Sequence, residues 1–599
     1  MSAVDFAVVG VYLIATLVLG LYLARRGSGS LVDFFLGGRA LPWWLAGTSM
    51  AATTFSIDTP LYIAGVVGTR GIAGNWEWWS FAVAHVLLVG VFARLWRRAA
   101  IVTDAELTEL RYGGRPAAVL RGTKSFLFAV VINSVGIGYA MLAMVKVIDA
   151  LEVFPALGLA PGETAKLWSV VAVSGLVVVY CGVAGLWGVV ATDFLQFVLG
   201  LAGAVVVAVV AVGHVGGLGA LAAEAQRLTS FDVLAIVPIG VESGRPVWSA
   251  LAGISGTTFL AYVTVQWWAF RRSDGGGEFI QRLAASRDER EAARAAWLFV
   301  VLHYVVRTWP WVLVALAAVV LYPDLADREL GYPRLMLDLL PAGVLGLVVA
   351  SLVAAFMSTV STLINWGASY LTNDLYARFL RPGAGSRELV LAGRAASVLV
   401  TGLGAIGAFV AEDIATVFRL IIAIGTGPGL VLILRWFWWR INAWAELAAM
   451  LAGFLVGLAT SVVPGLLVAD FGARLIVTAL VTAAIWVPVM LLTPPERDDT
   501  LDGFYRRVRP GGPGWRRQRR RTGVEPAQDL GHDVLRACAA LLVLLGLMFA
   551  VGFALLLDWS GAAVAGVAAA AGGAWLRRLG AARTGTTWEA PAAGPAARG

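Results

Sequence analysis

The chain has 599 residues, of which 59% are hydrophobic and only 14% are charged. Soluble domains carry about 25% charged residues, so this composition excludes a soluble protein and predicts an integral membrane protein surrounded by lipid. The net charge of +8 is explained by arginine-rich loops and does not indicate a nucleic-acid partner.

A membrane-spanning helix needs about 20 mostly apolar residues. We expect about 15 such spans, of which the last is the shortest. They lie near residues 5–25, 42–68, 76–99, 122–150, 166–188, 193–213, 247–270, 292–322, 340–372, 388–410, 413–436, 442–463, 472–493, 534–557 and 560–577.

Arginine is concentrated in every second loop, which predicts that these loops are cytoplasmic. The N-terminus is then outside the cell and the C-terminus inside, in a multi-pass protein of the plasma membrane. Segment 494–533 contains "YRRVRPGGPGWRRQRRR" and is predicted to be a solvated cytoplasmic loop whose arginines could also contact anionic lipid. The tail 580–599 is rich in Ala, Gly and Pro and is predicted to be disordered.

The second span contains the polar run "SMAATTFSIDTP" (49–60), with four hydroxyls among its last eight residues, a carboxylate and a proline. Backbone groups in hydrocarbon must be hydrogen-bonded within the chain unless they line a cavity or are covered by protein. We therefore expect a helix that is unwound halfway across the membrane, with carbonyls free to face a cation.

The ninth span contains a polar stripe formed by Ser358, Ser361, Thr362, Asn365 and Ser369. Their spacing places them on one face of a helix. Such a stripe is typical of helix–helix contacts made by small hydroxyl residues, and it is also compatible with an ion site. The spacing alone leaves both interpretations open.

Several segments, in order from about residue 33 to 376, resemble the sodium/solute symporter family, the relatives of the sodium/glucose and sodium/proline cotransporters. They are "DFFLGGRALPWWLAGTSMAATTFS", "LTELRYGG", "GLWGVVATDFLQ", "EFIQRLAASRDEREA" and "AAFMSTVSTLINWGASYLTNDLY". The last resembles the sodium-site helix of that family.

The resemblance implies an all-α membrane protein of the LeuT type, an inverted repeat of five plus five helices among about 13–15 transmembrane helices. We expect a peripheral first helix (1–30), a first repeat (42–215), an inverted second repeat (246–436), peripheral helices (441–493), the basic loop (494–533), C-terminal helices (534–579) and the tail (580–599).

The resemblance also implies a sodium site between the unwound helix and the ninth span. Its ligands would be the carbonyls of Ala52, Phe55 and Ala355 and the hydroxyls of Ser358 and Thr359. Oxygen ligands suit a hard cation. Asp193, in "ATDFLQ", corresponds to a carboxylate on the ion's cytoplasmic exit path in the family, although it could also simply begin a helix at the interface.

Polar residues inside the membrane are candidates for substrate contacts. Asp58 lies in the unwound run, where it could instead cap freed amides. By resemblance, Thr59, Glu77 and His303 fall at or near sugar-site positions, and Arg307 lies one turn after His303. Gln266 and Trp267 form an aromatic–polar pair that could pack on a sugar ring or a cation, or belong to an interfacial belt.

Neither the sugar pattern nor the proline pattern of the family is complete in this chain. We therefore expect sodium-coupled symport of a small polar organic solute, such as a sugar, amino acid or carboxylate, into the cell. Sodium would be the transported ion, with no organic cofactor, in a monomer or weak homo-oligomer. The alternatives are a proton-coupled transporter of the same fold, with Asp58 or His303 as the carrier, and a transporter-like sensor or scaffold. The sequence contains no compact catalytic group of residues and no Walker motif, so we do not expect an enzyme or an ATP-driven pump.

Overall fold

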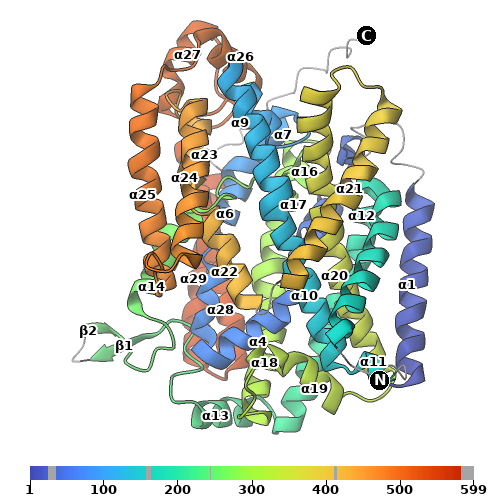
Figure 1. Ribbon diagram of the computed structural model, residues 1–599. Coiled ribbons are helices and arrows are strands. Elements are labelled where there is room, and N and C mark those ends of the chain that lie inside the picture. Colours follow the sequence, from blue (N-terminus) through green and yellow to red (C-terminus); the bar gives the residue numbers. More distant parts are fainter. Residues whose placement is uncertain (25–34, 157–162, 243–244, 411–413, 582–599) are drawn as a thin grey trace.

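The computed structural model describes all residues except 25–34, 157–162, 243–244, 411–413 and 582–599. Long helices stand side by side and make up most of the molecule (Figure 1). The described strands are β1 (Ile239–Glu242) and β2 (Arg245–Trp248), which pair as an antiparallel hairpin with Ile239 opposite Trp248. Residues 582–599 of the predicted tail and residues 25–30 of the predicted first segment lie outside the described residues, whereas residues 580 and 581 belong to the last helix.

In the labels below, η marks a short 3₁₀ or π-helical turn. The chain up to the hairpin forms α1 (Ala3–Ala24), η1 (Gly37–Arg39), α3 (Trp43–Thr53), α4 (Asp58–Arg70), η2 (Ile72–Asn75), α5 (Trp76–Trp79), α6 (Ala82–Leu87), η3 (Leu88–Phe92), α7 (Ala93–Ala99), α8 (Glu106–Arg111), α9 (Gly114–Phe126), η4 (Leu127–Ile132), α10 (Asn133–Ala150), α11 (Val153–Ala156), α12 (Glu163–Val215) and α13 (Leu218–Leu228).

The chain after the hairpin forms α14 (Gly256–Ala261), η5 (Tyr262–Gln266), α15 (Trp267–Ala269), α16 (Glu278–Ala285), α17 (Glu289–Val300), η6 (Val301–Val306), α18 (Thr308–Leu321), η7 (Arg328–Leu330), α19 (Gly331–Leu339), α20 (Val344–Ser369), η8 (Tyr370–Leu380), α21 (Ser386–Val410), α22 (Ile414–Gly425) and α23 (Gly429–Phe437). The C-terminal part forms α24 (Ala443–Val462), α25 (Phe471–Leu492), α26 (Asp498–Val508), η9 (Pro513–Trp515), α27 (Arg516–Thr522), α28 (Leu530–Leu555) and α29 (Trp559–Ala581).

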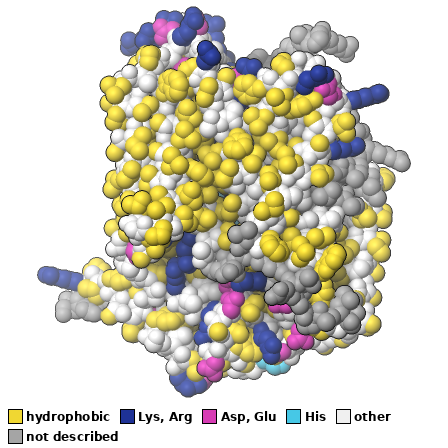
Figure 2. Space-filling model, viewed as in Figure 1, with side chains coloured by type: hydrophobic (Ala, Val, Ile, Leu, Met, Phe, Trp, Pro, Cys, Tyr) yellow, Lys and Arg dark blue, Asp and Glu magenta, His cyan; other side chains and the backbone are white. Residues whose placement is uncertain are grey.

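Among the described residues, nine helices are long and apolar enough to cross a membrane, and eleven if each of two bent helix pairs counts as one span. Hydrophobic side chains cover a broad belt of the surface, and the charged side chains gather toward its two ends (Figure 2). The prediction of a multi-pass membrane protein is confirmed. The last predicted span, 560–577, lies within α29, which is one of the nine.

The spans predicted over 166–188 and 193–213 both fall within the residues labelled α12, and the second lies inside the candidate membrane span Gly188–Val215. One predicted span differs from the structure. The span predicted over 413–436 is divided, since α22 ends at Gly425 and α23 begins at Gly429. Gly427 has a φ of +125°, which favours glycine and interrupts the helix there.

The basic segment 494–533 is a folded cap rather than a wholly solvated loop. Trp515 is 1% exposed, and its Nε1 donates to the carbonyl oxygen of Trp436 at 2.8 Å. The guanidinium of Arg111, at the end of α8, lies 5.0 Å from the centre of a Trp515 ring. The segment contains aromatic residues that lose contact with water when they pack on the helix ends, which explains why it is folded.

Candidate functional site: two interrupted helices around a cavity

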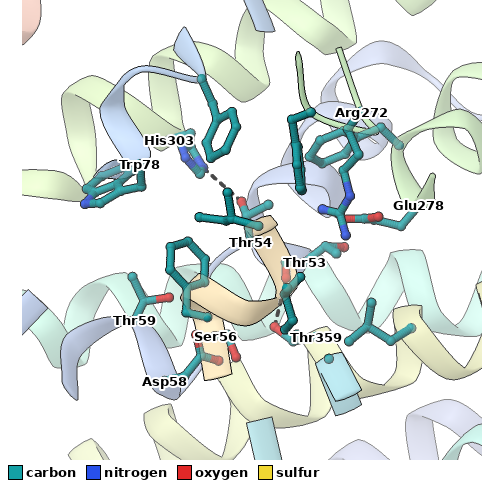
Figure 3. A pocket seen from close by; sticks show the side chains of 18 of the residues that line it. Thr53, Thr54, Ser56, Asp58, Thr59, Trp78, Arg272, Glu278, His303 and Thr359 are labelled. Carbon is teal, nitrogen blue, oxygen red and sulfur yellow. Dashed lines mark hydrogen bonds and ion pairs between the residues drawn. The ribbon is translucent and has the colours of Figure 1, made fainter. Parts of the chain in front are cut away.

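The first interrupted helix is the one that the polar run predicts. α3 ends at Thr53 and α4 begins at Asp58, and their axes differ by 55°. Pro60 lies in the first turn of α4, where its missing N–H costs no helical hydrogen bond, so the helix can start again there. Thr54 and Ser56, between the two helices, line a cavity, which Figure 3 shows together with Asp58 and Thr59.

A second interruption follows α15 and was not predicted. The chain leaves α15 after Ala269 and re-enters a helix, α16, at Glu278. Gly275 and Gly277 have φ values of +80° and +85° in this connection, a conformation that other residues rarely adopt. The run "RRSDGGG" (271–277) is the feature of the sequence that could have indicated this interruption. Its two arginines are also typical of an ordinary charged loop, so the interruption was missed.

Both interruptions border one cavity of about 230 Å³. It is slightly smaller than the range of about 300–1,000 Å³ that is usual for ligand pockets, and therefore suits a small solute. Five predicted substrate contacts line it: Asp58, Thr59, Trp267, His303 and Arg307. The sequence did not single out several other residues of the wall, among them Trp78, Arg271, Arg272, Glu278 and Tyr304.

The predicted sodium ligands lie where the end of α3 contacts α20. All five are buried: Ala52, Phe55, Ala355, Ser358 and Thr359. The Thr359 hydroxyl donates to the carbonyl oxygen of Thr53 at 2.8 Å, and the Thr53 and Thr362 hydroxyl oxygens are 3.1 Å apart. The polar stripe of α20 therefore joins this helix to the interrupted one. The contact also brings the Thr53 carbonyl, which was not predicted, next to the predicted ligands.

Asp193, on α12, lies directly beside this contact. It is fully buried and accepts a hydrogen bond from the Ser358 hydroxyl at 2.6 Å and another from Ser49. The Arg282 guanidinium lies 3.5 Å from the same carboxylate. A hydroxyl that donates to Asp193 keeps its oxygen lone pairs available, so Ser358 can still accept a cation.

Arg282, in the segment "EFIQRLAASRDEREA", occupies a buried place that the sequence did not indicate, since arginine-rich segments were predicted to form cytoplasmic loops. It is 1% exposed and donates to Ser49 at 3.0 Å and to Thr362 at 2.5 Å. One arginine thus connects α16 to α3 and α20. A local charge pattern cannot show this, because the partners lie in three distant segments of the chain.

His303 and Arg307 form a pair on the cavity wall. A terminal guanidinium nitrogen of Arg307 lies 2.5 Å from Nδ1 of His303, and the other donates to the Ala51 carbonyl at 3.2 Å. A guanidinium only donates hydrogen bonds, so Nδ1 of His303 must be the acceptor and the ring proton belongs on Nε2. In Figure 3 a dashed line joins the His303 side chain to Thr54, and the distance between His303 Nδ1 and Thr54 Oγ1 is 3.0 Å.

Glu77 and Gln266 are the two predicted substrate contacts that lie outside the residues lining this cavity. The Glu77 carboxylate pairs with Arg70 at 3.1 Å and with Arg419 at 2.9 Å. The Gln266 side-chain amide donates to the backbone carbonyl of Glu77 at 2.6 Å. Glu77 therefore joins α4, through Arg70, to α22, through Arg419.

With this geometry established, comparison with known proteins identifies the class. Residues 34–453 match the family model described as the sodium:solute symporter family, to which the chain therefore belongs. The chain is 26% identical to the sodium/glucose cotransporter of Vibrio parahaemolyticus, covering 83% of this chain and 92% of that protein. It is also 26% identical to the sodium/mannose cotransporter of Bos taurus, over 76% of this chain and 78% of that protein.

A solved structure of a Na⁺-coupled sialic acid symporter has the same fold, with a TM-score of 0.65, 20% sequence identity and coverage of 83% of this chain and 99% of that one. The predicted LeuT-type fold is confirmed. Family membership makes the chain a sodium-coupled symporter with sodium as the transported ion, and the relatives it matches are transporters.

Proposed function

We propose that this protein carries a small polar organic solute into the cell together with sodium, by alternating access. The contact between the end of α3 and α20 is the observation that supports this proposal most directly. Sodium would bind there through the carbonyls of Ala52, Phe55 and Ala355 and the hydroxyls of Ser358 and Thr359. The cavity that would hold the solute adjoins this contact, because Thr53 and Thr359 also line it.

Coupling follows from this proximity. An ion that joins α3 to α20 favours the conformation in which the cavity is complete, so ion and solute stabilise the same state. A membrane potential of −100 mV supplies about 2.3 kcal/mol for each positive charge that moves inward, and an inward sodium gradient adds to this. Asp193 would receive the ion on its way to the cytoplasm, because it already binds the Ser358 hydroxyl.

The organisation of the chain is part of the proposal. The two interrupted helices, α3–α4 and α14–α16, would occupy equivalent places in the repeats 42–215 and 246–436, with the remaining helices peripheral. The arginine-rich segments would face the cytoplasm, which places the N-terminus outside and the C-terminus inside.

Sodium-driven uptake into proteoliposomes tests the proposal, with a panel of sugars, amino acids and carboxylates at fixed pH. We expect Ser358→Ala and Thr359→Ala to raise the sodium concentration for half-maximal uptake by about 10-fold each, since each variant removes one oxygen ligand. Ser351→Ala is the matched control, because Ser351 is also buried on α20 and its hydroxyl donates to the carbonyl of Val348 in its own helix.

Unchanged sodium dependence in both variants would show that the ion site is elsewhere. Uptake that follows a proton gradient in the absence of sodium would favour proton coupling instead. Nδ1 of His303 accepts a hydrogen bond from Arg307. In the described structure this nitrogen is therefore not free to carry a proton, which weighs against His303 as the carrier in the proton-coupled alternative.

A further inference from the structure

Arg271 is a buried cation on the wall of the cavity. It lies in the connection between α15 and α16, and its backbone N–H donates to the Gly425 carbonyl at 2.9 Å. Only 3% of the residue is exposed. It is therefore enclosed by protein, unlike an arginine in a solvated loop.

The Arg271 guanidinium has unused donors. Its Nε and one terminal nitrogen are buried without a hydrogen-bond partner, and no ion pair to it occurs among the described residues. The other two cavity arginines are engaged: Arg272 binds Glu278, and Arg307 binds the Ala51 carbonyl and His303. Arg272 and Arg307 also have an unpartnered Nε, but each of them has a polar partner at a terminal nitrogen. Among the cavity arginines of the described residues, Arg271 has the most donor capacity left for a ligand.

Two carboxylates, Glu278 and Asp104, lie near Arg271, but neither forms an ion pair with it in the described part of the chain. Glu278 is taken by Arg272, and Asp104 lies 3.6 Å from the ammonium group of Lys124. Three aromatic rings surround the guanidinium, with centres at 5.6 Å for Phe128, 5.5 Å for Phe270 and 5.7 Å for a Trp366 ring. These rings favour a cation and restrict its orientation, but they leave its N–H groups unsatisfied.

A buried charge without a partner is costly, and a guanidinium matches a carboxylate through two parallel hydrogen bonds. We propose that Arg271 binds the carboxylate of the transported solute, so that the substrate class is small organic acids, zwitterions included. This inference rests on the proposed function and specifies its substrate. The body of the solute would extend toward Ser56, Asp58 and Thr59 of the first interrupted helix, whose polar groups suit hydroxyl or amino substituents.

Matched pairs of solutes test this proposal directly. We would measure binding to the full-length protein in sodium through intrinsic tryptophan fluorescence, since Trp78, Trp267 and Trp366 line the cavity. The pairs are lactate and lactamide, alanine and alaninamide, and glucuronate and glucose. We expect binding of at least one acid and of none of the neutral or amide partners.

The variant Arg271→Gln should weaken binding of that acid by about 100-fold, and Arg271→Lys should restore part of it, because Lys keeps the charge without the fork geometry. Arg294→Gln is the matched control, as Arg294 is exposed and pairs with Glu291 away from the cavity. The thermal unfolding temperature of Arg271→Gln should be equal to or higher than that of the wild type, since the variant removes an unpaired buried charge.

Equal binding of an acid and its neutral partner, failure of every acid to bind, or a marked loss of stability in Arg271→Gln would each overturn the assignment. Sodium-driven uptake of a neutral solute at the same rate in the wild type and in Arg271→Gln would also overturn the assignment of Arg271. The proposed sodium symport would not be affected by that result. Arg271-dependent binding of an acid that no sodium gradient moves would instead contradict the proposed function.

Discussion

At the scale of the residue, the most informative group is the cluster of Asp193, Ser358 and Arg282. A buried carboxylate beside the proposed ion site lowers the electrostatic energy of a cation there. The neighbouring guanidinium opposes this effect and keeps the carboxylate paired when no ion is bound. At a separation of about 6 Å and an effective dielectric constant of about 20, one charge changes the energy of another by about 3 kcal/mol. The cluster can therefore set how tightly sodium is held.

We predict that Asp193→Asn raises the sodium concentration for half-maximal uptake by about 10- to 100-fold, because it removes this negative charge but keeps the side chain's shape. The variant also leaves Arg282 without an anionic partner, so the unfolding temperature should fall. Measurements of sodium-dependent uptake and of thermal unfolding check the two effects.

The double variant Asp193→Asn/Arg282→Gln separates them. Stability should recover, since no unpaired charge remains, whereas the weakened sodium dependence should persist. Recovery of both properties would mean that Asp193 acts only as a structural partner of Arg282.

At the scale of the element, the first interrupted helix is held in place by α12. A Cβ on Gly200 would lie 2.7 Å from the Phe55 ring. That ring is confined by Phe197, at 5.7 Å between ring centres, and by Trp311, at 4.6 Å. The glycine allows the close approach that positions the Phe55 carbonyl, one of the proposed sodium ligands.

We predict that Gly200→Val displaces Phe55, costs about 1–3 kcal/mol of stability and raises the sodium requirement. Gly213→Val is the control, because a Cβ on Gly213, in the same helix, meets no atom within 4 Å. Thermal unfolding and sodium titration of uptake would be compared for both variants. Equal behaviour of the two would show that the Gly200 contact does not position the interrupted helix.

Asp470 links two further elements outside the spans. It caps α25 by accepting from the backbone N–H of Ala473, and it also accepts from the hydroxyls of Ser255 and Thr258 beside α14. Burial by itself raises the pKa of Asp470, but these hydrogen bonds outweigh it and leave the pKa below its ordinary value of 3.8. The carboxylate form is thus favoured in the folded protein.

A lowered pKa stabilises the fold at pH values above about 4, and this contribution is lost as the pH falls through the folded-state pKa. We predict that Asp470→Ala costs about 1 kcal/mol at neutral pH through loss of the cap. The difference in unfolding temperature between wild type and variant should shrink as the pH is lowered below about 4. A difference that does not change with pH would contradict this account.

At the scale of the whole molecule, Glu77 connects helices that must move apart if the cavity is to open on this side. Its pairs with Arg70 and Arg419 join α4 to α22, and its partner Arg419 lies 342 residues away in the sequence. Tyr62 of α4 and Phe418 of α22 line the cavity next to this link, with ring centres 4.8 Å apart. The ion pairs therefore favour a cavity that is closed on the side of Arg70.

We predict that Glu77→Gln increases access to the cavity from the side of Arg70, which the proposed topology places outside the cell. A Phe418→Cys reporter, in a chain whose native Cys181 and Cys538 are replaced by Ser, should react several-fold faster with a membrane-impermeant thiol reagent when Glu77→Gln is added. Glu224→Gln is the control, since Glu224 forms an exposed pair with Arg227. An unchanged rate would leave Glu77 as a substrate contact or a static support.

Local patterns in the sequence were sufficient for the membrane class, the interruption after Thr53 and the polar stripe of α20, because hydropathy and helical periodicity depend on neighbouring residues alone. The positions of the charged groups were not predictable in this way. Arg271, Arg282 and Glu77 stand in stretches of sequence that are typical of loops or of the membrane interface, yet all three are buried. Only the tertiary structure decides whether an arginine is solvated, paired or left with free donors, because the atoms that settle the question belong to segments far away in the chain.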